Sequence, residues 1–153
     1  MKLRTSVLTV AVCMVAAACF AATDAQMGTW KLNEAKSKFA TKSRNNTVVY
    51  TTAGDSVNVA IDGLDADGKP VHTEWTGKFD GKDYPVTGDP TSDTREYTAI
   101  DDHTLTFAGK KGGKVTISGK IVVSADGKNR TVTNTVTDAA GKKVKATAVY
   151  DKQ

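Results

Sequence analysis

From residue 46 onward the chain consists of short runs in which apolar and polar residues alternate, separated by clusters of turn-forming residues. In the run 71–79, Val71, Trp75 and Phe79 share one parity, while His72 and Glu74 share the other. Successive side chains of a β-strand point to opposite faces, so this pattern predicts strands with one covered and one solvated face. Strands are expected at 47–52, 56–62, 71–80, 83–87, 94–100, 104–108, 114–124, 130–137 and 143–151, and Trp30 with its neighbours would form a further, first strand.

The connections between these runs are short and have the composition of tight hairpins. The triplet Asp-Gly-Lys occurs at 67–69, 80–82 and 126–128. Glycine tolerates a positive φ there, and aspartate accepts hydrogen bonds from its own turn. Strands joined only by short hairpins form a meander, and a meander of this size leaves no exposed edge when it closes on itself. The sequence therefore predicts an all-β fold, an up-and-down antiparallel β-barrel of eight to ten strands.

One segment does not fit the strand pattern. Residues 33–38 lack alternation, and Asn33 is placed to cap a helical turn through Lys36. This turn would plug or flank one mouth of the barrel.

The composition of residues 26–153 supports sheet over helix. These 128 residues contain 13 valines and 19 threonines, whereas leucine occurs only at positions 32, 64 and 105. β-Branched side chains lose rotamer freedom in helices and pack well on a pleated sheet. Few large aliphatic residues also favour a single barrel with a lightly filled interior over a densely packed sandwich.

The first 25 residues have the three-part layout of a secretory signal peptide. A basic stretch with Lys2 and Arg4 precedes an apolar run at 5–20, and small residues follow up to Ala25. We predict cleavage after Ala25, which leaves one barrel domain of residues 26–153. The apolar run is short for a membrane span of about 20 residues, which disfavours an uncleaved anchor. The protein is expected to be exported to the periplasm or secreted.

Both cysteines, Cys13 and Cys19, lie inside this segment, so the barrel domain is not a disulfide scaffold. An alternative processing route remains open at the same place. The stretch Ala16-Ala17-Ala18-Cys19 resembles the bacterial lipobox, and lipidation at Cys19 would anchor the protein to the outer membrane.

The start of the predicted barrel carries a recognisable motif. Gly28-Thr29-Trp30 opens the first strand and resembles the Gly-x-Trp signature of lipocalins and other calycins. Together with the stretches at 31–39 and 80–88, it resembles small exported bacterial proteins of lipocalin-like type, whose function is mostly unassigned. The resemblance implies that Trp30 packs at the closed end of the barrel beneath a basic residue, for which Lys152 is the nearest match. The chain has no disulfide in the barrel domain and no evident C-terminal helix, both of which the narrow lipocalin family would lead one to expect. The resemblance therefore implies only the broader barrel type.

Sequence motifs for catalysis and metal binding are incomplete in this chain. Residues 63–70 have the spacing of a phosphate-binding loop, but Pro70 stands where Ser or Thr would hold the metal. The same stretch has Gly63 where a calcium loop begins with Asp. His72 and His103 are single and far apart, whereas a zinc site needs three or four ligands. We therefore expect no enzyme activity, no cofactor and no metal.

Basic residues gather in the C-terminal half. Lysines occur at 110, 111 and 114 and again at 142, 143 and 145. Nucleic-acid sites usually add arginines and stacking aromatic residues to such clusters, so we expect solvated hairpin tips and no nucleic-acid partner. Attraction to an anionic envelope surface remains compatible with this charge.

The interior of the barrel is the place where the sequence suggests a site. If the covered face runs through Trp75 and Leu105, alternation also turns several polar and aromatic residues inward. A barrel with such an interior suits a small hydrophobic or amphipathic ligand, with Arg or Tyr meeting an acidic head and aromatic rings its body. The candidate ligand-binding residues are Trp75, Arg95, Tyr97, Phe107, Arg130, Asn134 and Tyr150.

Two functional hypotheses follow. The first is an exported, monomeric binding protein that holds such a ligand. The alternative is a non-enzymatic envelope module with a filled core, in which Ala, Tyr and Trp occupy the interior and the arginine heads reach water at strand ends.

Overall fold

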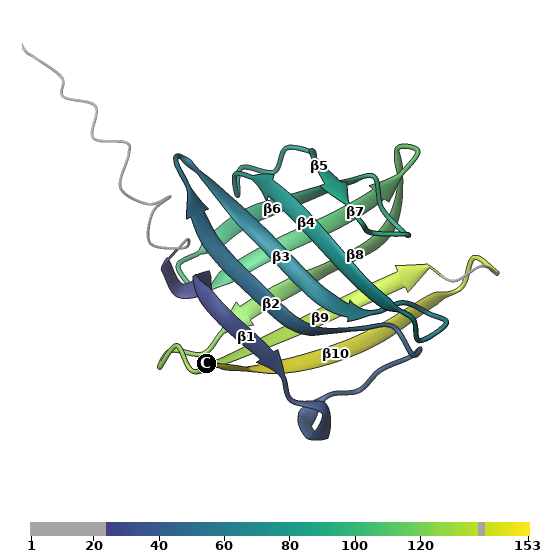
Figure 1. Cartoon of the computed structure of the whole chain (residues 1–153), viewed down its shortest axis with the longest axis horizontal. Coiled ribbons are helices and arrows are strands. Elements are labelled where there is room, and N and C mark those ends of the chain that lie inside the picture. The colour runs from purple at the N-terminus through teal and green to yellow at the C-terminus, as the bar shows by residue number, and fades with distance from the viewer. Residues whose placement is uncertain (1–23, 138–139) are drawn as a thin grey trace, which may run out of the picture.

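The computed structural model describes residues 24–137 and 140–153, and within them ten antiparallel strands close into one barrel (Figure 1). The strands are β1 (Gly28–Leu32), β2 (Arg44–Ala53), β3 (Ser56–Leu64), β4 (Pro70–Gly77), β5 (Tyr84–Thr87), β6 (Thr94–Asp101), β7 (Thr104–Lys111), β8 (Lys114–Val123), β9 (Asn129–Thr137) and β10 (Lys143–Lys152). Each strand pairs with the next along the chain, and β1 also pairs with β10. The predicted fold class is confirmed.

Two parts of the sequence interpretation fall wholly or largely outside these residues. The signal peptide predicted for 1–25 is described only at its last two residues, and Cys19 is not described. In the ranges that are described, no helix has the length and apolar character needed to cross a membrane.

The strand boundaries differ from expectation mainly at β4. This strand ends at Gly77 instead of continuing to residue 80. The chain turns there, because the Asp80 carboxylate accepts a hydrogen bond from the backbone N–H of Lys82 at 3.1 Å. Asp80 then pairs with Thr98 of β6 in an isolated bridge. Residues 79–81 therefore form backbone hydrogen bonds with β6 in the stretch of chain that precedes β5.

The expected helical turn is present as the 3-10 helix η1 (Glu34–Lys36). Its cap is Asn33, whose Oδ1 accepts from the Lys36 N–H at 3.2 Å. The Asn33 amide donates to Asp151 at 2.7 Å, and Lys38 pairs with Thr147. The segment therefore lies against β10, which is the flanking position of the two that were expected.

The barrel has two different ends. The first, which we call the closed end, contains residues 24–27 and the turns at 54–55, 102–103 and 124–128, toward the left of Figure 1. Gln26 is fully buried there, and its carbonyl accepts a hydrogen bond from the Trp30 indole at 2.8 Å. The second, which we call the mouth, contains the connections at 65–69, 88–93 and 112–113, toward the right of Figure 1.

Burial along the inner face changes from one end to the other. Near the closed end Trp30, Leu105 and Val123 are buried. Toward the mouth, inward-facing residues on β7, β8 and β9 are only half-buried: Phe107, Ile117, Val132, Asn134 and Val136. The packed core therefore occupies the closed end, and the interior loosens toward the mouth.

Gly119 is one of several inner positions of the barrel that have no room for a side chain. A Cβ on Gly119 would collide with the Thr133 carbonyl oxygen and lie 2.8 Å from Phe107 Cε1. Phe107 is the register partner of Gly119 on the neighbouring strand, so its ring lies over the glycine. This contact sets how far the ring extends into the barrel.

A compact trio of ionisable side chains lies on the outer face of β3 and β4. His72 Nδ1 lies 2.7 Å from Asp62 Oδ1, and His72 Nε2 lies 3.2 Å from Glu74 Oε1. All three are exposed on β3 and β4. The hydrogen bond to Asp62, followed by that to Glu74, raises the pKa of His72 above its ordinary value.

The Gly119→Ala variant should unfold more easily than the wild type. The added methyl group must displace backbone or the Phe107 ring, and such overpacking costs about 1–3 kcal/mol. Urea unfolding followed by tryptophan fluorescence measures the change. Ser118→Ala, one residue along on the exposed outer face, is the matched control and should stay within about 0.5 kcal/mol of the wild type. Equal effects of the two variants would contradict the assigned register.

The pKa of His72 should be measurably raised by its two carboxylates. Because the folded-state pKa is raised, this group stabilises the fold fully below about pH 6.5 and loses that effect as the pH rises through the folded pKa. Histidine NMR titration should show a lower pKa in Asp62→Asn and a smaller decrease in Glu74→Gln. A pKa unchanged by Asp62→Asn would show that the trio does not form.

Candidate functional site

The middle of the barrel contains a cluster of aromatic rings contributed by β4, β5, β6 and the turn after β4. Trp75 is its centre: its ring stacks on Phe79 at 6.2 Å and meets Tyr97 edge-on at 4.8 Å and Tyr84 at 5.7 Å. The Trp75 indole N–H donates to the backbone carbonyl of Arg95 at 2.9 Å, so its only polar atom is satisfied. Aromatic pairs in this geometry add to the stability gained from burial, which makes this wall of the interior rigid.

One of the two interior arginines is paired. Arg95 Nη2 lies 2.6 Å from Asp89 Oδ2, and the two side chains are only 10% and 9% exposed. Asp89 belongs to the connection 88–93 at the mouth, whereas Arg95 projects inward from β6 next to Tyr84 of β5. The charge on Arg95 is therefore neutralised by a loop carboxylate.

The other interior arginine is held by rings. Arg130, at the start of β9, is 2% exposed. Its guanidinium carbon lies 4.7 Å from the centre of the Tyr150 ring, 5.2 Å from Tyr50 and 5.3 Å from Trp30. Among the described residues no carboxylate comes within 4.0 Å of it, and its Nε and Nη1 atoms have no hydrogen-bond partner.

The tyrosines beside Arg130 do not supply the missing negative charge. Burial raises the pKa of Tyr50 far above its ordinary value, although the neighbouring Arg130 acts in the opposite direction. Burial raises the pKa of Tyr150 as well, again against the influence of Arg130. Both phenols are thus neutral at any physiological pH, and the guanidinium charge is stabilised by the ring faces and the hydroxyl groups of uncharged tyrosines.

The two arginines belong to one polar cluster. Arg95 and Tyr97 both lie close enough to Tyr50 to influence its pKa, and Tyr97 also influences Tyr150. We call this set the arginine–tyrosine cluster; its members are Tyr50, Arg95, Tyr97, Arg130 and Tyr150. It carries two positive charges against the single carboxylate of Asp89, so the centre of the barrel is electropositive.

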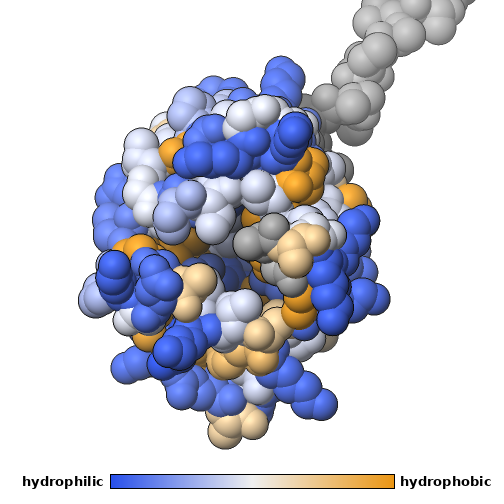
Figure 2. Space-filling model, turned by 90° about the vertical axis from the view of Figure 1, so that its right-hand side faces the viewer, coloured by the Kyte–Doolittle hydropathy of each residue, from blue (hydrophilic) through white to orange (hydrophobic). Residues whose placement is uncertain are grey.

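The inner face of β8 to β10 includes small residues among its aliphatic ones. Gly119, Ala146 and Ala148 lie there, and we call this part of the interior the wall of small residues. Asn134 stands between Gly119 and Ala146, and its Oδ1 is buried without a partner. Figure 2 looks onto the mouth, where the surface is hollowed near its middle and residues of mixed hydropathy, several of them hydrophobic, border the hollow.

The motif at the start of β1 has the geometry that the resemblance implies. Gly28 has a φ of 100°, which a side chain would strain, and a Cβ there would lie 3.3 Å from the Lys152 side chain. Lys152 Nζ lies 5.1 Å from the centre of the Trp30 ring, and Trp30 and Lys152 are register partners on β1 and β10. Arg130 covers the ring as well, so Trp30 contacts two cations.

All seven residues predicted to contact a ligand project into the barrel, and they fall into three groups. Trp75, Tyr97 and Phe107 belong to the ring wall, where Tyr97 and Phe107 lie 6.0 Å apart. Arg95, Arg130 and Tyr150, together with Tyr97, are members of the arginine–tyrosine cluster. Asn134 stands apart from both, on the wall of small residues. Their role in binding stays a prediction.

Sequence reasoning missed Tyr50, a member of the cluster, and Asp89, the carboxylate that pairs with Arg95. Tyr50 could have been found, because it shares the parity of Val48 in a predicted strand. Asp89 could not, since it lies in a loop without periodicity and only the fold brings it to Arg95.

The described ranges of the chain lack a ligand set of the kind that a metal ion requires. No group of three or more His, Cys, Asp and Glu side chains there is arranged to hold a metal ion. His103 lies at the closed end beside Gln26, far along the barrel from the Asp89 loop. What the arrangement offers is an electropositive, ring-lined interior.

Comparison with known proteins supports the fold. No protein-family model matches the chain, and no curated protein matches it in sequence. Among solved structures, EF1p2_mFAP2b bound to DFHBI superimposes with a TM-score of 0.50 at 14% identity, covering 88% of this chain and 99% of its own. The redesigned β-barrel mFAP1 bound to DFHBI has a TM-score of 0.45 at 18% identity, covering 86% of this chain and 98% of its own. The redesigned barrel b11L5F_LGL has a TM-score of 0.46 at 13% identity, covering 86% and 95%. At these identities the similarity establishes the barrel fold alone.

Proposed function

We propose that this protein is an exported, non-enzymatic binding protein that holds a small amphipathic molecule inside its barrel, with an acidic head at the arginine–tyrosine cluster. The observation that carries the proposal is Arg130. Its charge is buried, it has no carboxylate partner among the described residues, and two of its donor atoms make no hydrogen bond.

The energetic argument rests on the cost of burying that charge. Removing an ion from water costs several kcal/mol even after relaxation, and buried charges are usually paired. Each cation–π contact returns about 0.5–2 kcal/mol, so three rings offset only part of the cost. An acidic head near Arg130 could accept from Nε or from Nη1, both of which lack a partner, and a hydrogen bond between two charged groups is about twice as strong as a neutral one.

The body of the ligand would lie between the ring wall and the wall of small residues. Trp75 and Phe107 supply flat apolar surface, and Ala146 and Ala148 are the small side chains of the opposite wall. The mouth offers the route of entry, since the inner residues toward it are half-buried. The barrel EF1p2_mFAP2b, which shares this fold, is bound to DFHBI, so the architecture accommodates a small molecule.

The export part of the proposal rests on the layout of residues 1–25. Cleavage after Ala25 would leave Gln26 as the first residue, and the carbonyl that accepts the Trp30 indole would be retained. Periplasmic or secreted localisation of a monomer follows from this route, whereas lipidation at Cys19 would place the barrel at the outer membrane.

A matched pair of fluorescent dyes tests the ligand proposal. 8-Anilino-1-naphthalenesulfonate and N-phenyl-1-naphthylamine share one ring system and differ by the sulfonate. The wild type should bind the sulfonate dye with quenching of its two tryptophans, Trp30 and Trp75. Arg130→Met should weaken that binding at least about tenfold, about 1.4 kcal/mol, and leave binding of the neutral dye nearly unchanged.

Two further variants keep this experiment decisive. Arg130→Lys retains the charge and should bind the sulfonate dye with intermediate affinity, while Lys120→Met on the exposed outer face should behave as the wild type. Near-ultraviolet circular dichroism checks that each variant is folded. If a folded wild type binds neither dye, the filled-core envelope module becomes the better description.

The N-terminus of the exported chain is a separate prediction. Mass spectrometry of protein purified from the periplasm of a bacterial host should give a chain that begins at Gln26. A mass corresponding to a diacylated or triacylated Cys19 would instead establish the lipoprotein route.

A further inference from the structure

The mouth of the barrel combines exposed apolar side chains with lysines. We propose that this end docks on a membrane surface rich in anionic lipids. The surface, which we call the mouth lip, consists of Ile117, Val136 and Val144 on the inner face, Val115 on the outer face, and Lys114, Lys143 and Lys145 around them. This inference goes beyond ligand binding and does not depend on it.

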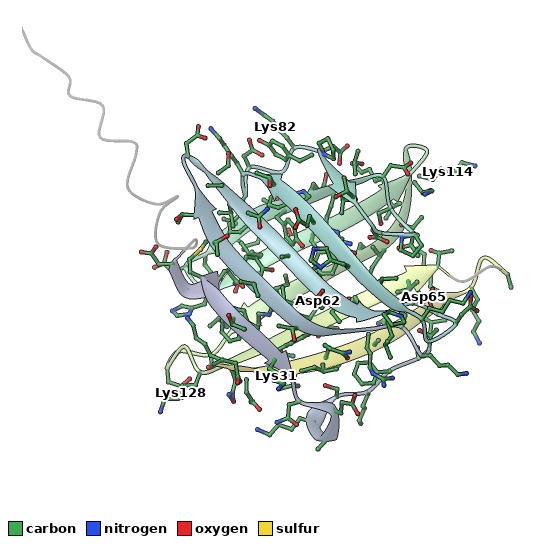
Figure 3. The ribbon with its side chains drawn as sticks, in the orientation of Figure 1. Lys31, Asp62, Asp65, Lys82, Lys114 and Lys128 are labelled. Atoms are coloured by element: carbon green, nitrogen blue, oxygen red, sulfur yellow. The ribbon has the colours of Figure 1, made fainter. Side chains whose placement is uncertain are left out.

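The lysines of the lip are available for an outside partner. Lys114, Lys143 and Lys145 are exposed, and no described carboxylate lies within 4.0 Å of them. Figure 3 shows Lys114 at the far right of the molecule, at the tip of the hairpin between β7 and β8. Neighbouring lysines differ: Lys110 pairs with Asp83 and Glu96, and Lys111 pairs with Asp93.

The apolar residues of the lip are partly exposed. Val115 is 53% exposed on the outer face, and Ile117, Val136 and Val144, in register on the inner face, are half-buried. Val115, Lys143 and Lys145 also border a groove of about 380 Å³ on the outside of β8 to β10 that is otherwise lined by hydroxyl side chains. Lysine next to apolar surface fits the membrane interface, where the chain contacts the acyl boundary and the ammonium meets phosphate.

A lipid surface fits this lip better than a nucleic acid. Single-stranded nucleic acids are bound by basic grooves that include stacking aromatic residues, and the lip contains valines and no aromatic ring. Anionic lipid attracts each nearby lysine with about 1 kcal/mol, and exposed valines add burial that a nucleic acid does not offer.

The charge at the closed end also favours an orientation in which the mouth of the barrel faces the membrane. The closed end exposes carboxylates at Asp24, Asp55, Asp101, Asp102 and Asp126. Lys78, which pairs with Asp55, and Lys128 offset part of this charge, so an anionic surface attracts the closed end less than the lip and favours a mouth-first approach.

Vesicle binding tests the inference on the exported, processed chain. Co-sedimentation should show binding to vesicles of 30% phosphatidylglycerol in phosphatidylcholine and none to pure phosphatidylcholine, with loss of binding in 0.5 M salt. The lip variant Lys114→Glu/Lys143→Glu/Lys145→Glu should bind at least tenfold more weakly. The matched control Lys31→Glu/Lys82→Glu/Lys128→Glu makes the same charge change at exposed sites away from the mouth (Figure 3) and should lose less than threefold.

The orientation is measured by a fluorophore at one position. Because both natural cysteines precede residue 24, Val115→Cys and Lys128→Cys each give a single labelling site in the processed chain. An environment-sensitive dye should shift to the blue on anionic vesicles at position 115 and not at position 128.

Three results would overturn the proposal. These are equal weakening by the two triple variants, a blue shift at position 128 alone, and tighter binding to a DNA oligonucleotide than to the vesicles at the same salt concentration. Each is readable whether or not the barrel binds the dyes described above, so the two proposals can fail separately.

Discussion

The fold depends on the joint at which the first and last strands meet, and Trp30 is the centre of that joint. Its strand pairs with β2 on one side and β10 on the other, so the barrel has no edge there. Its indole N–H is bonded to Gln26, which ties residues 24–27 across the closed end. Lys152 and Arg130 contact its ring, and these come from β10 and β9. The Trp30 side chain thus connects residues 24–27, at the start of the described chain, to β9 and β10 near its end.

The same joint explains why a cation is buried in the barrel. Arg130 contributes to closure by packing on Trp30, Tyr50 and Tyr150, so its position is set by the aromatic residues around it. Its charge nevertheless remains in a region from which water is excluded. A residue needed for closure therefore also creates an electropositive interior, and the structural and binding roles of Arg130 need not exclude each other.

The sequence predicted the strands well because the period of a strand is local. Val57, Val59 and Ile61 alternate with polar neighbours, and they are the buried positions of β3. Closure of the barrel was predictable because the strands predicted from residue 46 onward are joined by short hairpin connections. The set of residues that meet in the site was harder to predict from the sequence, because it depends on which residues of distant strands face each other in the closed barrel. Tyr50 on β2 contacts Arg130 on β9, and Asp89 in a loop pairs with Arg95 on β6. The local sequence around Tyr50 or Asp89 contains no pattern that predicts these partners.

The lipidation alternative at Cys19 and docking through the mouth lip place the barrel in opposite orientations. Residues 24–27 lie at the closed end, and the stretch from Cys19 to Asp24 reaches at most about 18 Å when fully extended. A lipid at Cys19 would hold the closed end near the membrane despite its carboxylates and turn the lip away. Processing after Ala25 removes that tether and leaves the charge of the barrel to orient it. The N-terminus of the exported chain therefore determines whether the lip can face the membrane that the anchor would occupy.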